Sequence, residues 1–200
     1  MSEFDLKARD WDADADKVAR AERVAAAIRA QVGDLSGRSA LEVGCGTGLL
    51  GFALRPHVAR MTLADTSAGM LEVLREKIAA SGLPGMEALQ HDFTQGPLPA
   101  DRYGLLCNLM TLHHIPDTED AFRRFHGLLE PGGLLCIADL DTEDGSFHGA
   151  GVEVHHGFDR EGLRAGLERA GFRDIRFDTP YVIDRGGKRY PVFLVVAVRP

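Results

Sequence analysis

The chain has 200 residues, of which 44% are hydrophobic and 26% are charged, and its formal net charge is −7. This length suits one well-buried domain and is short for two. Because the chain is acidic and has no run of basic residues, we expect no nucleic-acid partner. Neither a secretory signal nor an apolar stretch that could span a bilayer is recognisable, so we expect a cytoplasmic protein with no membrane partner.

The three cysteines, Cys45, Cys107 and Cys136, are widely spaced and odd in number. This pattern argues against a disulfide framework or a zinc ribbon. We expect them to be small buried hydrophobic residues.

The start of the chain predicts a helix and then two strands separated by a glycine turn and a second helix. Residues 15–32 place apolar side chains at helical spacing, and Gly33 is a natural stop. Residues 39–44 are typical of a short buried strand, 47–56 of a helix, and 60–65 of a second strand.

The middle of the chain continues this alternation. Ser67 can cap a helix that runs to Ile78, with Gly82 beyond its end. Short apolar strands alternating with helices predict a parallel sheet covered on both faces. The further strands are predicted at 85–92, 102–110 and 134–141, and the further helix at 117–133.

The carboxyl end breaks the alternation. Residues 159–171 predict one more helix, and residues 172–184 and 189–198 predict two strands. Only four residues join these strands, too few for a crossover helix, so they must pair antiparallel. Gly186-Gly187 suits a primed hairpin turn. The one long irregular stretch is residues 141–158, and long loops in compact domains are often functional.

The glycine turn after the first strand has two possible interpretations. Gly46, Gly48 and Gly51 have the spacing of a dinucleotide-binding turn. A second pattern overlaps it, in which an acidic residue, Glu42, is followed by glycine at every second position, 44, 46 and 48. Because the strand ends near Gly44, Gly51 falls inside the following helix, where a missing side chain permits close packing. No lysine follows the glycines, which excludes a phosphate-binding loop of the Walker type.

Acidic residues at the strand ends favour a cationic cofactor. Asp65 lies 19 residues beyond Gly46 and can accept both hydroxyls of a ribose under either interpretation. Glu42 and Asp92 add negative charge where a pyrophosphate would need neutral or positive surroundings. The same charge would favour a sulfonium or an amino group.

These motifs together resemble the class I S-adenosylmethionine-dependent methyltransferases, particularly those that act on small molecules. The resemblance covers about residues 39–140. It rests on "LEVGCGTG" after the first strand, Asp65 after the second, "HDF" after the third, "LHHIPD" after the fourth and "LEPGG" before the fifth.

The resemblance implies that S-adenosylmethionine is the cofactor and gives each matching residue a role. Glu42 and the backbone of Gly44, Gly46 and Gly48 would line the methionine side, and Asp65 would hold the ribose hydroxyls. Thr66 and Met70 would lie near the adenosine, Asp92 and Phe93 would hold the adenine, and Asn108 and Leu109 would face the methionine moiety through the backbone.

A methyl acceptor that loses a proton from oxygen or nitrogen needs a base, and histidine titrates near neutral pH. The loop 141–158 carries His148, His155 and His156 to the end of the fifth strand, where an acceptor would lie. These three histidines are therefore the candidate catalytic residues.

Three further features of the sequence are candidates for the site. One of His113 and His114, in "LHHIPD", is a candidate contact of the cofactor or acceptor. Trp11, the only tryptophan, is a candidate lid over the cofactor. A metal site formed by the loop histidines with Glu153 and Asp139 would suit several divalent ions, but its spacing fits no standard ligand pattern, so we predict no metal.

We therefore predict a Rossmann-like three-layer α/β/α sandwich with a mostly parallel seven-stranded sheet in the order 3-2-1-4-5-7-6. The expected function is methyl transfer to an oxygen, nitrogen or other nucleophilic atom of a small molecule, and no sequence feature specifies an oligomeric state. The alternatives are an NAD(P)-dependent oxidoreductase and a non-catalytic S-adenosylmethionine-binding protein. The single domain, 1–200, would comprise an amino-terminal helical cap (1–33), a cofactor-binding core (34–140), an acceptor-side loop (141–158) and a terminal helix and hairpin (159–200).

Overall fold

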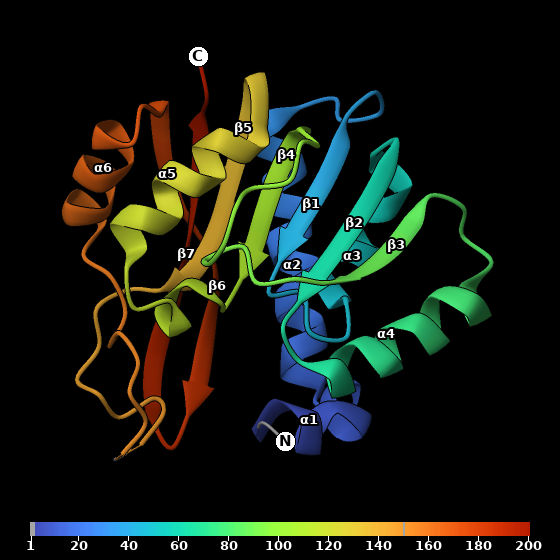
Figure 1. The fold of residues 1–200 in the computed structure, drawn as a ribbon. Coiled ribbons are helices and arrows are strands. Elements are labelled where there is room, and N and C mark those ends of the chain that lie inside the picture. Colours follow the sequence, from blue (N-terminus) through green and yellow to red (C-terminus); the bar gives the residue numbers. More distant parts are fainter. Residues whose placement is uncertain (1–2, 150) are drawn as a thin grey trace.

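In a computed structural model that describes residues 3–149 and 151–200, seven strands form one sheet in the order β3-β2-β1-β4-β5-β7-β6 (Figure 1). The predicted strand order is confirmed. Strands β1 to β5 run parallel, and β7 pairs antiparallel with both β5 and β6. The strands are β1 (Ser39–Val43), β2 (Arg60–Asp65), β3 (Met86–Gln90), β4 (Tyr103–Leu109), β5 (Leu129–Leu140), β6 (Arg173–Arg185) and β7 (Lys188–Val198).

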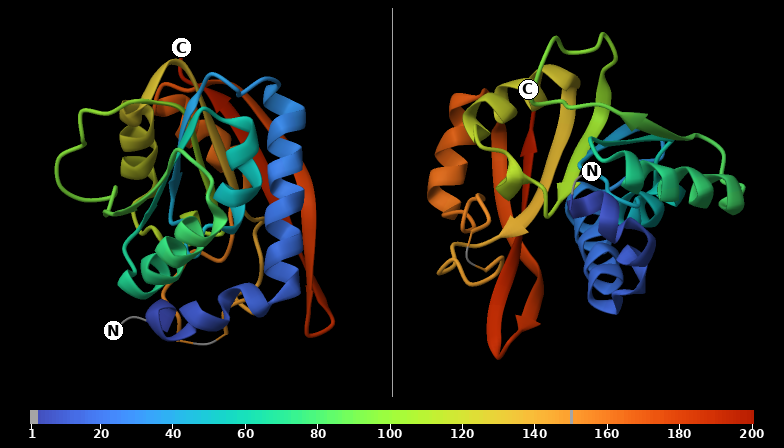
Figure 2. Two further views of the ribbon diagram at one scale, coloured as in Figure 1. Left: turned by 90° about the vertical axis from the view of Figure 1, so that its right-hand side faces the viewer. Right: turned by 60° about the horizontal axis from the view of Figure 1, so that its bottom comes forward.

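Helices cover both faces of this sheet, as the alternation predicts (Figure 2). One buried cluster joins the sheet to α2, α3 and α4, and a second joins it to α5 and α6. The helices are α1 (Glu3–Lys7), α2 (Ala15–Val32), α3 (Leu49–Leu54), α4 (Ala68–Ser81), α5 (Thr118–Leu128) and α6 (Arg160–Arg169), with short 3-10 turns η1 (Ala8–Ala13), η2 (Arg55–His57) and η3 (Leu112–His114). Among the described residues, no helix combines the length and apolar character that crossing a bilayer requires.

The helix ends follow from their capping residues. The Ser67 hydroxyl accepts the Met70 amide at 3.2 Å, and Gly82 closes α4 with a φ of 62°. The Asp14 carboxylate accepts the amides of Asp16 and Lys17, which starts α2. The predicted starts and stops of both helices are confirmed to within three residues.

The helix predicted within residues 117–133, closed by Pro131 and its glycines, ends slightly earlier than this stop. Helix α5 stops at Leu128, and β5 already begins at Leu129. A residue before proline disfavours helical backbone, and Glu130 precedes Pro131. The Gly132 amide also donates to the Arg199 carbonyl at 2.8 Å, which adds this segment to the sheet.

The terminal hairpin holds the long irregular loop. Gly186 and Gly187 connect β6 and β7 with φ values of 58° and 75°, as a primed turn requires. Near this turn the Tyr190 ring packs edge-on against Phe147 at 5.1 Å, and its hydroxyl lies 2.7 Å from the Ser146 hydroxyl. The hairpin therefore holds the part of this loop around Ser146 and Phe147.

The three cysteines are free and buried, as predicted. Their thiols contribute to the core through apolar packing. The carboxyl ends of β1 to β5 meet at one edge of the sheet, called the carboxyl edge below. The amino-terminal helices lie across it (Figures 1 and 2).

Candidate functional site

The glycine turn lies at the carboxyl edge and needs glycine at several positions. Gly44, Gly46 and Gly48 have φ values of 70°, 53° and 84°, a region that side chains disfavour. A Cβ at Gly44 would lie 2.2 Å from Thr111 Cγ2. The Gly44 amide donates to the Ala64 carbonyl at 2.8 Å, which ties the turn to β2.

Gly51 packs inside helix α3. A Cβ there would lie 2.2 Å from Leu63 Cδ2 and 2.8 Å from the Glu42 Oε2 atom. The helix can approach the sheet only because this side chain is absent. The prediction that Gly51 serves helix packing is confirmed.

Glu42 lies beneath the glycine turn and not on its open side. The side chain is buried, and its Oε2 atom has no hydrogen-bond partner among the described residues. Burial raises the pKa of Glu42 to about 8, with a further contribution from the Asp65 charge, against the opposing effects of the Gly51 amide and Lys77. The carboxyl is therefore mostly neutral at pH 7, and its predicted cofactor contact stays a prediction.

Asp65 stands at the carboxyl end of β2. Its Oδ2 atom accepts the Gly46 amide at 2.7 Å, and its Oδ1 atom accepts the Ser67 amide at 2.8 Å. The residue is half-buried, and a carboxylate has about four acceptor positions, so lone pairs remain for further donors. This arrangement suits the hydroxyls of a ribose.

The residues predicted around adenosine differ in their surroundings. Thr66 is exposed beside Asp65, whereas Met70 is buried and its sulfur lies 3.9 Å from where a Gly46 Cβ would be. Phe93 is buried. Asp92 Oδ1 accepts the amide and hydroxyl of Thr94 at 2.9 and 2.6 Å, so this carboxylate also organises its own loop.

The end of β4 carries an unpaired amide and an unusual backbone. Asn108 is fully buried, and neither side-chain amide atom has a partner among the described residues. Leu109 is half-buried, and Met110 follows with a φ of 55°, which is uncommon for a side chain other than glycine. Strained backbone of this kind is often found at functional sites.

The amino-terminal segment covers the glycine turn. The Trp11 Nε1 atom lies 3.8 Å from the position of a Gly46 Cβ. The Asp12 carboxylate accepts the Thr47 hydroxyl and pairs with Lys77 Nζ at 2.6 Å. We call residues 3–13 the N-terminal cover.

The N-terminal cover also reaches α4 and the end of β4. Asp5 Oδ1 accepts the Ser67 hydroxyl at 2.6 Å and the Gly69 amide at 3.0 Å. The Phe4 ring contacts the His114 ring edge-on, with 5.3 Å between centroids. One short segment therefore touches both ends of the candidate site.

Three histidines meet at the ends of β4 and β5. The ring centroids of His113, His114 and His148 are 4.2 to 5.5 Å apart. His113 is buried, and its Nδ1 lies 2.6 Å from Oδ1 of the buried Asp139, whose Oδ2 accepts the His113 amide at 3.1 Å. We call His113, His114 and His148 the histidine cluster.

Two rings of the histidine cluster, those of His114 and His148, have lowered pKa values. Burial lowers the pKa of His114 to about 4, and the neighbouring His113 and His148 lower it further. Burial followed by the effect of His113 also lowers the pKa of His148. The exposed His114 leads from the cluster to solvent.

The other two loop histidines lie outside the cluster. His155 Nε2 donates to the carbonyls of Ile115 and Pro116 at 3.0 and 3.2 Å, which fastens the loop to the segment after η3. The exposed His156 ring lies against Gly145. Of the three predicted catalytic histidines, only His148 joins the cluster, and the catalytic role of all three stays a prediction.

This chain is similar to known proteins in sequence and in fold. Residues 40–133 match a family model described as a methyltransferase domain. Residues 40–133 are thus similar to a methyltransferase domain, and this stretch includes the glycine turn, Asp65 and the histidines that follow β4. It is 32% identical over 140 residues to an uncharacterised methyltransferase of Schizosaccharomyces pombe, covering 62% of this chain and 49% of that protein. The chain spans about half the length of the curated relatives it matches.

Two solved structures share the fold of this methyltransferase domain. A chain in the complex between the Haloferax volcanii Trm112 methyltransferase activator and a methyltransferase aligns with a TM-score of 0.81 and 19% identity, covering 100% of this chain and 99% of that one. The Haemonchus contortus phosphoethanolamine N-methyltransferase 2, solved with phosphomonomethylethanolamine and S-adenosylhomocysteine, aligns with a TM-score of 0.75 and 15% identity, covering 89% and 52%. At these identities the likeness shows the fold.

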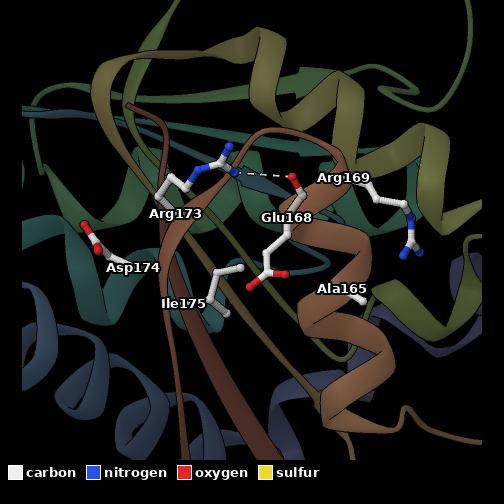
Figure 3. Close-up of a pocket in the computed structure, with 6 residues that line it drawn as sticks. All are labelled: Ala165, Glu168, Arg169, Arg173, Asp174 and Ile175. Atoms are coloured by element: carbon white, nitrogen blue, oxygen red, sulfur yellow. Dashed lines mark hydrogen bonds between the residues drawn. The ribbon is translucent and has the colours of Figure 1, made fainter.

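A surface hollow of about 540 Å³ lies away from the methyltransferase site (Figure 3). It is formed by the end of α6 and the start of β6, where Arg173 pairs with Val198 of β7. This is the opposite edge of the sheet from the glycine turn, and both charges line it. The hollow therefore has no part in the candidate site. It is lined by Ala165, Glu168, Arg169, Arg173, Asp174 and Ile175.

Sequence reasoning missed two parts of the methyltransferase site. The first is the contact of Asp5 and Asp12 with the edge, for which the acid-rich start of the chain was the only signal. The second is the pairing of His113 with Asp139. Both residues were named as candidates, but their contact depends on how β4 and β5 end side by side.

Proposed function

We propose that this protein transfers the methyl group of S-adenosylmethionine to a small-molecule acceptor. The observation that carries the proposal is the Asp65 carboxylate, fixed by two backbone amides beside Gly46. A Cβ at Gly46 would meet nothing closer than 3.8 Å, so the backbone there leaves room for a ligand. The family assignment of residues 40–133 supports this cofactor.

The cofactor, when bound, supplies a methyl sulfonium, which is already activated for in-line displacement. The chain must then hold the reactants in line and keep water away. Asp65 would hold the ribose hydroxyls, and the N-terminal cover, with Trp11 over Gly46, would exclude water from the glycine turn. Both roles need positioning and no covalent chemistry by the protein.

A small acceptor is supported by charge and by the covered edge. The net charge of −7 is unfavourable for a polyanionic acceptor. The N-terminal cover and the loop 141–158 both reach the carboxyl edge, which favours a compact ligand over a macromolecule. The Haemonchus neighbour, a separate protein, was solved with a small acceptor. Among the loop histidines, His148 is the one we expect to act on the acceptor side, directly or through a bound ion.

Calorimetry with S-adenosylhomocysteine tests the cofactor role of Asp65. We expect Asp65→Asn to weaken binding at least tenfold, because charge-assisted hydrogen bonds to the ribose are lost; tenfold corresponds to about 1.4 kcal/mol. The matched control is Asp34→Asn, an exposed aspartate that caps the Ser36 amide at 2.9 Å and lies far from the glycine turn. Circular dichroism checks that both variants fold.

Absence of binding to the wild-type protein, or equal weakening by both variants, would refute the cofactor site. Incubation with S-adenosylmethionine and a library of phenols, amines, thiols and carboxylic acids then tests catalysis through formation of S-adenosylhomocysteine. The small-molecule proposal would be contradicted if S-adenosylhomocysteine formed with protein or RNA as the acceptor but with none of the small acceptors.

A nicotinamide oxidoreductase has no support in this geometry. The dinucleotide-binding glycine pattern that would favour it depends on Gly51, which packs against Leu63 and Glu42 inside α3. NADH fluorescence on mixing would expose such binding if it occurred.

A further inference from the structure

The histidine cluster contains buried nitrogens that nothing else in the site uses. The Nε2 atoms of His113 and His148 are both buried without a hydrogen-bond partner among residues 3–149 and 151–200. An unsatisfied buried polar atom costs about 1–3 kcal/mol, so native proteins rarely keep two in one place. Such a pair calls for an occupant.

We propose that His113, His114 and His148 bind one divalent transition-metal ion, with zinc as the reference metal. One ring nitrogen from each residue lies within 4.8 Å of the other two. Neutral imidazole is a common ligand for zinc and its neighbours in the periodic table, and three protein ligands leave a position for water or another small ligand. This ion is independent of the cofactor at Asp65.

The geometry requires only a small adjustment. Tetrahedral zinc with zinc–nitrogen bonds of about 2.1 Å separates its ligand atoms by about 3.4 Å, so the nitrogens must close by roughly one ångström. His114 is exposed and can rotate towards the rings of His113 and His148. The ion also has a route from solvent along the same side chain.

Asp139 orients the first ligand. Its Oδ1 atom lies 2.6 Å from His113 Nδ1, which places the proton on Nδ1 and leaves the Nε2 lone pair free. The same carboxylate accepts the backbone amides of His113 and Leu140 at 3.1 and 2.8 Å. Asp139 is thus a positioning residue, and its negative charge favours a bound cation.

The surrounding charges are mixed but favour a cation. The carboxylates of Asp139, Glu143 and Glu3 act on the cluster, and Arg185 opposes them. These three metal ligands differ from the site considered in the sequence analysis, which combined the loop histidines with Glu153 and Asp139. His155 is not among them because its Nε2 atom already donates to two carbonyls.

The experiment is a titration of the full chain, without a polyhistidine tag, with cobalt(II) and with zinc(II). We expect one cobalt ion per chain with the visible absorption bands of a tetrahedral site, and displacement of cobalt by zinc. His148→Ala and His114→Ala should each weaken binding at least tenfold. Asp139→Asn should weaken it about 10- to 100-fold, since loss of a carboxylate that hydrogen-bonds a ligating histidine typically has this effect.

His57→Ala is the control, because His57 lies at the end of η2, where it pairs with Arg29 at 2.7 Å. This variant should keep the wild-type affinity. Thermal melting shows whether each variant is folded, and His114→Ala, at an exposed position, keeps the test decisive if the buried variants unfold. Absence of tetrahedral bands from the wild type, or wild-type affinity in folded His114→Ala or His148→Ala, would overturn the proposal. Failure of cofactor binding at Asp65 would not contradict the metal-site proposal.

Discussion

At the scale of single residues, Glu42 shows how one buried group links pH to stability. The pattern around the glycine turn led us to expect a charged carboxylate facing the cofactor. The structure buries this carboxyl between β1 and α3, where desolvation raises its pKa to about 8, and its contact with the cofactor stays a prediction. A sequence pattern fixes the residue type but not the dielectric around it, which depends on packing from elements far away in the chain.

Glu42→Gln tests this burial. Between pH 4.5, the ordinary pKa of the group, and pH 8, the unfolded chain has released the Glu42 proton while the folded chain keeps it. The wild-type free energy of unfolding should therefore fall as the pH rises through this window, by about 3 kcal/mol between pH 5 and 8. In Glu42→Gln this decline should disappear, as measured by urea unfolding at several pH values. Glu87→Gln, on an exposed position of β3, should keep the decline.

At the scale of elements, the local signals predicted most of the framework. The capped helices, the parallel strands and the Gly186-Gly187 hairpin follow from spacing, capping residues and turn chemistry. Helix α1 has only five residues and was not predicted individually, since so short a helix depends on tertiary contacts. The histidine cluster likewise needs a loop that brings His148 back to His113, which lies 35 residues earlier in the chain, and no local pattern encodes this return.

Gly51→Ala tests the contact between α3 and the sheet. The added methyl group would overlap Leu63, so we expect the free energy of unfolding to fall by about 1–3 kcal/mol despite the better helix propensity of alanine. Gly37→Ala is the control, since a Cβ there meets nothing within 4 Å. Adding Leu63→Val should recover part of the loss in a double-mutant cycle. Additive losses would show that this contact is not the cause.

At the scale of the whole molecule, the candidate site is closed by segments from both ends of the sequence. The N-terminal cover reaches the glycine turn and α4, while the loop 141–158 is held by the hairpin on one side and by His155 on the other. The charged contacts of the cover lie near the surface, where ion pairs contribute little. The cover is therefore expected to be less stable than the core.

Limited trypsin digestion tests how the cover responds to ligand. Lys7 and Arg9 are exposed in the cover, and cleavage beside them should be slower with saturating S-adenosylhomocysteine, because ligand contacts stabilise the closed segment. Cleavage at the exposed Lys188, next to the hairpin turn, should keep its rate and serves as the internal control. Equal rates at Lys7 and Arg9 with and without ligand would show that the cover does not respond to the cofactor.

The placement of Phe4 against His114 and of Trp11 over Gly46 has a kinetic consequence. A single segment of eleven residues, 3–13, spans the cofactor end and the acceptor end of the site. Both ligands would then share one gate, and the gate could not open for one without exposing the other. Turnover would be limited by how often this segment lifts, and both products would leave in the same opening.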